Sequence, residues 1–377
     1  MKRIIVFGGS FDPVQLGHVQ SVRVMSERFD KTVIVPCRIS PFKTEADIAP
    51  PEDRIAMLRM SLAGLKNVEI SRYETDSSGV SYTCRTLRHF KELWPDAEFS
   101  IAIGSDMLDR LNDWREADYL KRNARWFVTE RQGFSLAALD ERRAEGYDIE
   151  FSGITIRDYS SAKIKADLAF GVTADISEDV AAYIAEKGLY GKYPSMTARY
   201  SEFGMKQSRI DHTYRAVIAG IKLAKLHGED TDKTITALIL HDIGKYADEA
   251  LLLEKGINVP DEISAMPQAV RHAPVGALIA EKCFGITDRL ILDAIKYHTT
   301  GKPDMSLLGR IVYIADMTEA GRDFPGVETI RALACTDLDA AMAYALGRSL
   351  EYVNGCGGVV APGTAEAYEY YSNKTKR

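Results

Sequence analysis

Short apolar runs alternate with amphipathic stretches along the first half of the chain. The segments that we predict as strands lie at residues 4–7, 31–36, 68–71, 99–103 and 126–129. The segments between them place apolar residues three to four positions apart, which is typical of helices with one buried face, at residues 19–28, 54–62 and 82–93. Strands that alternate with helices on this spacing form a parallel sheet. We therefore predict an α/β domain with a doubly wound, Rossmann-like sheet that binds ligands at the carboxyl ends of its strands.

The pattern changes to almost continuous helix after residue 208. Apolar residues recur at helical spacing over residues 213–226, 233–240, 268–283, 288–297, 306–318 and 338–354. Residues 193–207, between the two patterns, contain turn residues and little periodicity. The sequence thus predicts a first domain over residues 1–192, a linker over residues 193–207 and an all-α helical bundle over residues 208–377.

Composition narrows the function classes. A length of 377 residues suits two domains, and a net charge of −6 without a basic stripe argues against nucleic-acid binding. The five cysteines are scattered and form no C-x-x-C pair, which fits a reducing compartment. No stretch approaches the roughly 20 apolar residues that a membrane span needs. These features predict a cytoplasmic protein that binds neither nucleic acid nor membrane; the oligomeric state stays open, with a homodimer as one option.

A glycine-rich segment follows the first predicted strand and opens the first helix. It reads Gly-Gly-Ser-Phe-Asp-Pro-Val-Gln-Leu-Gly-His over residues 8–18. Gly8 and Gly9 let the backbone approach a ligand, and the N–H groups at the start of a helix attract phosphate. His18 is placed where an imidazole can donate to a phosphoryl oxygen. The segment predicts a phosphate site, although a plain strand–turn–helix corner with a capping histidine has the same local pattern.

This segment resembles the G-G-x-F-D-P-x-H-x-G-H opening of the nicotinate-nucleotide adenylyltransferases, and further matches extend to about residue 190. Matching strings include Ile-Ser-Pro-Phe-Lys over 39–43, Ser-Tyr-Thr over 81–83, Ile-Gly-Ser-Asp over 103–106 and Ser-Ser-Ala-Lys-Ile-Lys over 160–165. The resemblance implies a nucleotidyltransferase of NAD biosynthesis that joins nicotinate mononucleotide to the α-phosphorus of Mg²⁺-bound ATP. The positions that it implies for binding or catalysis are Gly8, Gly9, Ser10, Phe11, Gln15, His18, Lys43, Tyr82, Thr83, Gly104, Asp106, Trp114, Ser160, Ser161 and Lys165.

Three positions depart from the family pattern. Gln15 replaces the first histidine of H-x-G-H, Lys165 replaces an arginine, and Ala162 replaces a threonine. Glutamine cannot carry charge, and lysine lacks the two-pronged geometry of a guanidinium. These changes weaken phosphate stabilisation, so a nucleotide-binding domain that has lost catalysis is a second interpretation of this half.

The helical half contains six side chains of the types that bind metals. They are His212, His241, Asp242, His272, His298 and Asp316, and most of them lie beside an apolar run. Imidazole and carboxylate ligands suit a hydrolytic transition-metal centre, and two metals need about this many. Adjacent His241 and Asp242 converge most easily near a helix end, which Gly244 supplies. Asp242 is the natural candidate for a carboxylate that bridges the two metals.

The order H…HD…D is the signature of the HD phosphohydrolases. Local strings such as Tyr-Ile-Ala-Asp over 313–316 and Glu-Ala-Gly-Arg over 319–322 resemble the bacterial HD hydrolases that split diadenosine tetraphosphate symmetrically into two ADP. The resemblance covers about residues 205–360 and implies a di-iron centre, with manganese or cobalt as substitutes. Lys245 and Arg322 are then expected to neutralise the polyphosphate, unless they are ordinary surface charges. Another nucleotide phosphohydrolase, or a module without enzymatic activity, remains as an alternative for this half.

Overall fold

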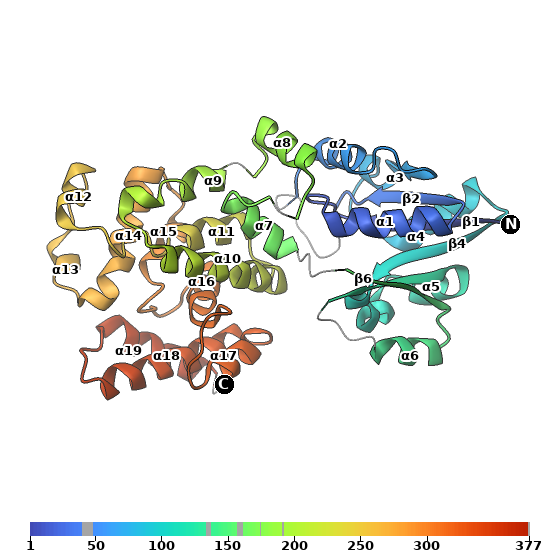
Figure 1. Ribbon diagram of the computed structural model, residues 1–377. Coiled ribbons are helices and arrows are strands. Elements are labelled where there is room, and N and C mark those ends of the chain that lie inside the picture. The colour runs from blue at the N-terminus through green and yellow to red at the C-terminus, as the bar shows by residue number, and fades with distance from the viewer. Residues whose placement is uncertain (40–47, 133–136, 157–160, 174, 191, 376–377) are drawn as a thin grey trace. The chain divides into compact units, whose positions relative to one another are not determined.

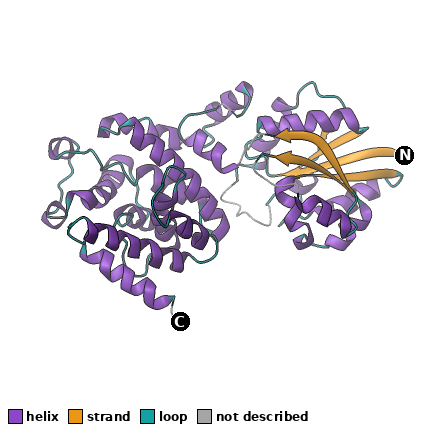
Figure 2. Ribbon diagram, turned by 60° about the horizontal axis from the view of Figure 1, so that its bottom comes forward, coloured by secondary structure: helices purple, strands orange, loops and turns teal. Residues whose placement is uncertain are grey.

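The computed structural model describes residues 1–39, 48–132, 137–156, 161–173, 175–190 and 192–375, and all structural statements below concern these residues. The chain divides into two compact units. The first comprises residues 1–164 and 173–189, and the second comprises residues 165–172 and 190–377. Strands occur in the first unit, whereas the second is helical (Figures 1 and 2).

The first unit contains a six-stranded parallel sheet in the order β3-β2-β1-β4-β5-β6. The strands are β1 (Lys2–Gly9), β2 (Lys31–Pro36), β3 (Val68–Ile70), β4 (Ala97–Gly104), β5 (Arg125–Arg131) and β6 (Ile149–Ile156). The central strand β1 pairs with β2 on one side and with β4 on the other. Strands β2 and β3 are added on one side of β1, and β4, β5 and β6 on the other. Sheets of this kind bind ligands in the crevice at the carboxyl ends of the two strands where the order changes side, here β1 and β4. The predicted α/β doubly wound class is confirmed.

Alternate side chains of the central strands enter two separate cores, because successive residues of a strand point to opposite faces. On one face, Ile4 and Val6 pack with Cys84, Leu87 and Phe90 of helix α4 (Thr83–Leu93). On the other face, Ile5 packs with Met25 of helix α1 (Leu16–Arg28) and with Phe29, Ala102 and Phe127. Burial on both faces explains why β1 is a continuous apolar run.

The remaining helices of the first unit connect the strands. They are α2 (Pro51–Ser61), α3 (Tyr73–Asp76), η2 (Ser105–Asp113), α5 (Ala117–Asn123), α6 (Ala137–Ala144) and α8 (Glu178–Lys187). Helix α7 (Ser161–Ala169) begins in the first unit and ends in the second. The pattern of apolar residues did not predict strand β6. This edge strand is half-exposed and contains Gly153 at a φ of +74°, so it lacks the apolar run that marks the inner strands.

The second unit is built from packed helices, as predicted. Their bounds are α9 (Lys192–Thr197), η3 (Tyr200–Phe203), α10 (Gln207–His227), α11 (Thr231–Leu240), α12 (Glu249–Glu254), α13 (Asp261–Ser264), α14 (Gln268–Phe284), α15 (Arg289–Lys296), α16 (Leu307–Thr318), α17 (Val327–Ala334), α18 (Leu338–Gly355) and α19 (Pro362–Lys374). Helix α11 is the most deeply buried of the long helices, since residues 234–240 are all buried. No described helix is long and apolar enough to cross a membrane.

The segment predicted as a linker is part of the second unit. Residues 192–203 form α9 and η3, and Tyr193, Tyr200 and Phe203 are buried. The Tyr200 hydroxyl donates to the carbonyl oxygen of Ile239 at 2.6 Å, which ties η3 to α11. The two helices are only 6 and 4 residues long, which is too short for a helical period to be recognised in the sequence.

Candidate functional site

The six predicted metal ligands of the second unit come from five places in the helical bundle. His212 lies in α10, His241 and Asp242 follow α11, His272 lies in α14, His298 follows α15, and Asp316 lies in α16. The four histidines contact Asp242, and Asp316 contacts His212. Four histidines and Asp242 are buried, with Asp242 only 3% exposed. The structure therefore brings together residues that are more than 100 positions apart in the chain.

The end of α11 aims its two ligands into the bundle. The helix reads Ala-Leu-Ile-Leu before His241, and its buried apolar side chains carry His241 and Asp242 into the core. Gly244 lies in the following turn, where a Cβ atom would meet the carbonyl oxygen of His272 at 2.5 Å and the amide of Gly276 at 2.7 Å. Only glycine fits this approach, so Gly244 sets how close α14, and with it His272, can lie to Asp242.

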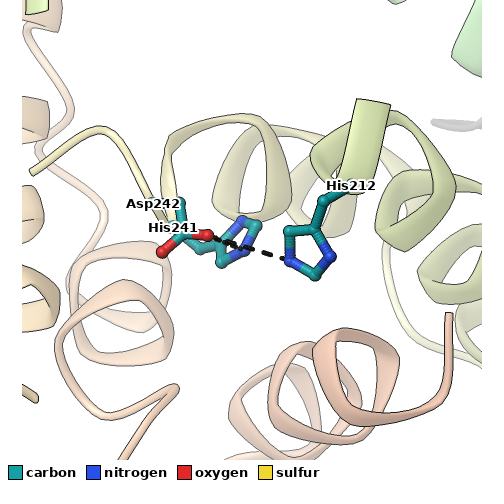
Figure 3. A group of neighbouring side chains, drawn as sticks. All are labelled: His212, His241 and Asp242. Atoms are coloured by element: carbon teal, nitrogen blue, oxygen red, sulfur yellow. Dashed lines mark ion pairs between the residues drawn. The ribbon is translucent and has the colours of Figure 1, made fainter. Parts of the chain in front are cut away.

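The two oxygens of Asp242 face two different pairs of histidines. Asp242 Oδ2 lies 3.3 Å from His241 Nε2 and 3.8 Å from His212 Nε2 (Figure 3). Asp242 Oδ1 lies 3.1 Å from His272 Nε2 and 3.7 Å from His298 Nε2. The ligand atoms of each trio, one carboxylate oxygen and two imidazole nitrogens, lie within 4.8 Å of one another. Asp316 joins the first trio, because its Oδ1 lies 2.9 Å from His212 Nε2.

Hydrogen bonds at Nδ1, the ring nitrogen that points away from the cluster, fix the orientation of three imidazoles. Nδ1 of His241 contacts the carbonyl oxygen of Leu238 at 2.6 Å, and Nδ1 of His298 contacts that of Ile295 at 2.8 Å. A carbonyl only accepts, so Nδ1 carries the proton in both rings and the lone pair of Nε2 points into the site. Nδ1 of His212 is likewise held, at 3.2 Å, by the carboxylate of Glu319. Such support is typical of histidines that bind metals.

The donor set fits a pair of metal ions. Nε2 of His212 and Nε2 of His241 are buried and face carboxylate oxygens, of Asp316 at 2.9 Å and of Asp242 at 3.3 Å, without good hydrogen-bond geometry. Buried acceptor atoms that face one another are costly unless a cation lies between them. Imidazole and carboxylate donors together suit iron, manganese, cobalt or zinc. A metal held by the first trio would satisfy both nitrogens, His272 and His298 would hold a second metal, and Asp242 would contribute to both.

The electrostatics of the cluster keep its ligands ready to bind. Burial opposes the charge of Asp242, but the surrounding imidazoles, His241 first, hold the pKa of this carboxyl well below its ordinary value. Burial lowers the pKa of His272 to about 4, so this imidazole is neutral at physiological pH. Burial also acts against a charged His241, but the adjacent Asp242 outweighs it and raises the pKa of His241. A proton therefore competes with a metal ion more strongly at His241 than at His272.

Cationic side chains surround the cluster. Arg322 Nη2 lies 2.6 Å from Asp316 Oδ1, and Lys245 Nζ lies 3.3 Å from His272 Nδ1, which places both predicted substrate-neutralising residues at the site. Burial lowers the pKa of the Lys245 amine. Sequence reasoning missed two residues here, Arg209 and Glu319. Each lies three positions from a ligand, Arg209 before His212 and Glu319 after Asp316, and this one-turn spacing was the available signal.

The glycine-rich segment over residues 8–18 is held in place by a buried arginine. Arg54, fully buried in α2, donates to the carbonyl oxygens of Ser10 at 2.8 Å and Ala49 at 2.9 Å. Asp12 Oδ1 accepts the amide of Ala49 at 3.1 Å. Phe11 is buried with a φ of +49°, and its ring lies 3.1 Å from where a Cβ on Gly9 would be. The segment after β1 is thus a fixed scaffold that depends on glycine at position 9.

His18 and Gln15 meet at the start of α1. The amide of Gln15 donates to His18 Nδ1 at 3.2 Å, so Nδ1 is an acceptor and the proton resides on Nε2. Both residues line a pocket at the carboxyl edge of the sheet, together with Gly104 and Arg131. The Nε2–H group of the histidine is therefore available as a donor, and its contact with a phosphoryl oxygen stays a prediction.

Arg131, at the end of β5, is a pocket residue that sequence reasoning missed. Its Nε lies 3.3 Å from Asp106 Oδ1, and its amide is held by Ser105 Oγ at 3.0 Å. A Cβ on Gly104 would lie 2.3 Å from Asp106 Oδ1 and 2.7 Å from Arg131 Nε, so glycine leaves room for this ion pair. The position of Arg131 just beyond a predicted strand, at the ligand-binding edge, was the signal.

The other predicted residues of the first unit are distributed as follows. Tyr82 precedes α4, Thr83 begins it, and the guanidinium of Arg115 lies 4.7 Å from the Tyr82 ring centroid. Trp114 packs edge-to-face on Trp126 at 5.5 Å and is partly buried against the core. Lys43 and Ser160, and the side chain of Ser161, lie outside the described residues.

Lys165 does not belong to the unit that carries His18. It lies in the part of α7 that belongs to the second unit, and its side chain is 6% exposed. Its role in supplying charge to the phosphates stays a prediction.

Comparisons with known proteins match each half separately and the whole chain together. A cytidylyltransferase-like family model matches residues 6–167, and an HD domain model matches residues 209–321. A probable nicotinate-nucleotide adenylyltransferase/Ap4A hydrolase of Mycoplasma pneumoniae is 27% identical over 355 residues, which is 93% of this chain and 98% of the relative.

Two shorter relatives each resemble one half. A symmetrical bis(5′-nucleosyl)-tetraphosphatase of Halalkalibacterium halodurans is 36% identical over 167 residues, covering 44% of this chain and 89% of the relative. A probable nicotinate-nucleotide adenylyltransferase of Geobacillus thermodenitrificans is 33% identical over 200 residues, covering 52% of this chain and 89% of the relative. With its parallel sheet, its buried histidine–aspartate cluster and this two-part similarity, the chain belongs to the enzyme family that fuses a nicotinate-nucleotide adenylyltransferase to an HD-domain symmetrical bis(5′-nucleosyl)-tetraphosphatase.

Proposed function

We propose that the second unit hydrolyses diadenosine tetraphosphate symmetrically, giving two ADP, at a centre of two metal ions. The observation that carries this proposal is the placement of the two carboxylate oxygens of Asp242, each of which faces a separate pair of imidazoles. His212, His241 and Asp316 would hold one ion with Asp242 Oδ2, and His272 and His298 would hold the other with Asp242 Oδ1. We propose iron for both ions, with manganese or cobalt as substitutes.

The bound metals would supply a water of lowered pKa and would polarise the phosphoryl oxygens. The protein's own side chains perform the remaining tasks. Asp242 and Asp316 keep their negative charge because their pKa values lie well below the ordinary value, so they neutralise the metal ions at physiological pH. Arg322 and Lys245 lie beside the ligands and can pair with phosphate oxygens, the first through its two-pronged guanidinium and the second as a compact charge.

The hydrolase proposal is tested by product analysis of purified protein and of Asp242→Asn. We expect ADP as the sole product from diadenosine tetraphosphate and about two metal ions per chain by elemental analysis. Asp242→Asn should abolish hydrolysis, because a neutral amide cannot bridge two cations. ATP plus AMP as products would contradict symmetrical cleavage, and activity on nucleoside monophosphates alone would indicate another phosphohydrolase.

We further propose that the first unit transfers the adenylyl group of ATP to nicotinate mononucleotide. The supporting geometry is the pocket at the carboxyl edge of the sheet, into which His18 and Gln15 bring polar groups and Arg131 a positive charge. Attack by the mononucleotide phosphate on the α-phosphorus of ATP releases pyrophosphate, and His18 would stabilise the charge that develops there. Mg²⁺ would enter with ATP, held largely by phosphate oxygens.

One observation favours a second candidate, in which only the hydrolase is active. Gln15, which lines the described pocket, is uncharged where the family pattern has a histidine, and Lys165 replaces the family's arginine. Pyrophosphate release from ATP and nicotinate mononucleotide distinguishes the two candidates. Release that is lost in His18→Ala supports the transferase, whereas no release at high enzyme concentration, with diadenosine tetraphosphate hydrolysis intact, supports the second candidate.

A further inference from the structure

Arg209 is a cation of the metal cluster that none of the predicted roles uses. It lies in the first turn of α10, three residues before His212, so both side chains project from the same face of the helix. Its Nη1 donates to Asp242 Oδ2 at 2.8 Å. The Arg209 side chain is 26% exposed while Asp242 is 3% exposed, so the guanidinium reaches from the surface down to the bridging carboxylate.

Arg209 contacts the side of the cluster that contains His212 and His241. Oδ2 is the Asp242 oxygen that faces His241 and His212, whereas Oδ1 faces the other histidine pair. A metal ion bound at Oδ2 would place a second positive charge beside the same oxygen. Two cations near one carboxylate oxygen repel each other and compete for its lone pairs. The guanidinium and a metal ion at this position would therefore compete for Asp242 Oδ2.

Arg322 makes the same kind of contact on the same side. Its Nη2 donates at 2.6 Å to Asp316 Oδ1, the atom that lies 2.9 Å from His212 Nε2. Two guanidiniums thus hold the two carboxylates that would bind the first ion. Two divalent ions would take over these carboxylates and leave the arginines with excess positive charge at a partly exposed rim. A chain of phosphate groups is the ligand that complements such a rim, since guanidinium pairs with phosphate through two parallel hydrogen bonds.

We propose that Arg209 is a phosphate-binding residue of the hydrolase site, which competes with the first metal ion for Asp242 Oδ2 and pairs with the phosphate chain of the substrate when metal is bound. The proposal rests on the metal-dependent hydrolase function proposed above for this unit. It assigns Arg209 two measurable effects of opposite sign. Arg209 weakens binding of the first metal, and it strengthens binding of a polyphosphate to the metal-loaded site.

The test compares the full-length protein with Arg209→Gln, Arg209→Lys and Arg310→Gln. Arg310 pairs with Asp339 at 2.6 Å in the same unit, with a side chain 20% exposed, so Arg310→Gln removes a guanidinium–carboxylate pair of similar burial away from the cluster. Calorimetric titration of Mn²⁺ into metal-free protein measures metal affinity. Titration of methylenediphosphonate, whose P–C–P bridge hydrolases do not cleave, into metal-loaded protein measures phosphate binding.

We expect Arg209→Gln to bind the first Mn²⁺ on the order of tenfold more tightly and methylenediphosphonate on the order of tenfold more weakly than Arg310→Gln. Arg209→Lys should lie between, because it keeps the charge and loses the fork. Unchanged phosphonate affinity, or weaker Mn²⁺ binding in Arg209→Gln, would overturn the proposal. Failure of the wild-type protein to hydrolyse diadenosine tetraphosphate would overturn the assigned substrate only, because both titrations are independent of turnover.

Discussion

Replacing Glu319 with glutamine should weaken one metal position and leave the other unchanged. Glu319 is 1% exposed, and its carboxylate accepts hydrogen bonds from His212 Nδ1, from Arg215 and from the amide of Gly321. It thereby presents Nε2 of His212 to the first trio of ligands. Glutamine has the same shape, but its amide must turn its NH₂ group towards either His212 or Arg215, and both are donors.

The size of the effect follows from the lost interaction. A hydrogen bond to a charged partner contributes about 1.5–3 kcal/mol. At about 1.4 kcal/mol per factor of ten, this corresponds to roughly 10- to 150-fold in affinity, in agreement with the 10–100-fold typical of residues that support metal ligands. Arg215 is 36% exposed, so water can solvate it after the substitution and the fold should survive. His272 and His298 make no contact with Glu319 among the described interactions, so the second position should keep its affinity.

The assay is a two-site calorimetric titration of Mn²⁺ into metal-free protein. Glu328→Gln is the matched control, because it makes the same charge change at a glutamate that is 81% exposed and pairs with Arg331. We expect one site weakened by about 10- to 100-fold in Glu319→Gln and two unchanged sites in Glu328→Gln. Two unchanged sites in Glu319→Gln, or an equal loss at both, would show that Glu319 does not act through His212.

Three further predictions concern other parts of the chain. Acidification of the metal-free protein from pH 6.5 to pH 4 should lower its free energy of unfolding by up to about 3 kcal/mol through His272. Burial lowers the pKa of this imidazole from 6.5 to about 4, so the unfolded chain takes up the proton first. Urea unfolding of His272→Gln should lack this part of the pH dependence. Gly244→Ala should destabilise the protein by about 1–3 kcal/mol and reduce its metal content, because the new Cβ would lie 2.5 Å from the carbonyl oxygen of His272, whereas Gly355→Ala has open space around it and should unfold like the wild type in thermal scans. His18→Ala should lower the kcat of pyrophosphate release by about 100- to 1000-fold and leave diadenosine tetraphosphate hydrolysis unchanged.

Each of these three has an outcome that contradicts it. An equal pH slope in the wild type and His272→Gln would mean that another group dominates acid destabilisation. Wild-type stability of Gly244→Ala would mean that α14 can move away without cost. Transferase activity of His18→Ala within a few-fold of the wild type would remove this histidine from the proposed chemistry.

Local patterns in the sequence were sufficient for the fold class of both units. Strands buried on both faces must be apolar throughout, and helices with one buried face must repeat at three to four residues, so β1, β2, α10 and α15 can be recognised without tertiary information. The glycine-rich turn and the His241–Asp242 pair are also local features. Edge strand β6 and the segment over residues 192–203 were missed, because an exposed edge needs no apolar run and helices of 6 and 4 residues are too short to show a period.

The sequence also contained the six candidate ligands, but it could not divide them into two groups. That division depends on the directions of Oδ1 and Oδ2 of Asp242, which the packing of α10, α14, α15 and α16 around the end of α11 determines. The contacts of Arg209 and Glu319 with the cluster likewise arise from helix packing, since their partners lie 33 and 107 residues away. The sequence by itself determined which chemical groups are available. Only the tertiary structure decided which atoms share a site, because distances of 3 Å between remote residues are set by the close packing of side chains rather than by any local preference.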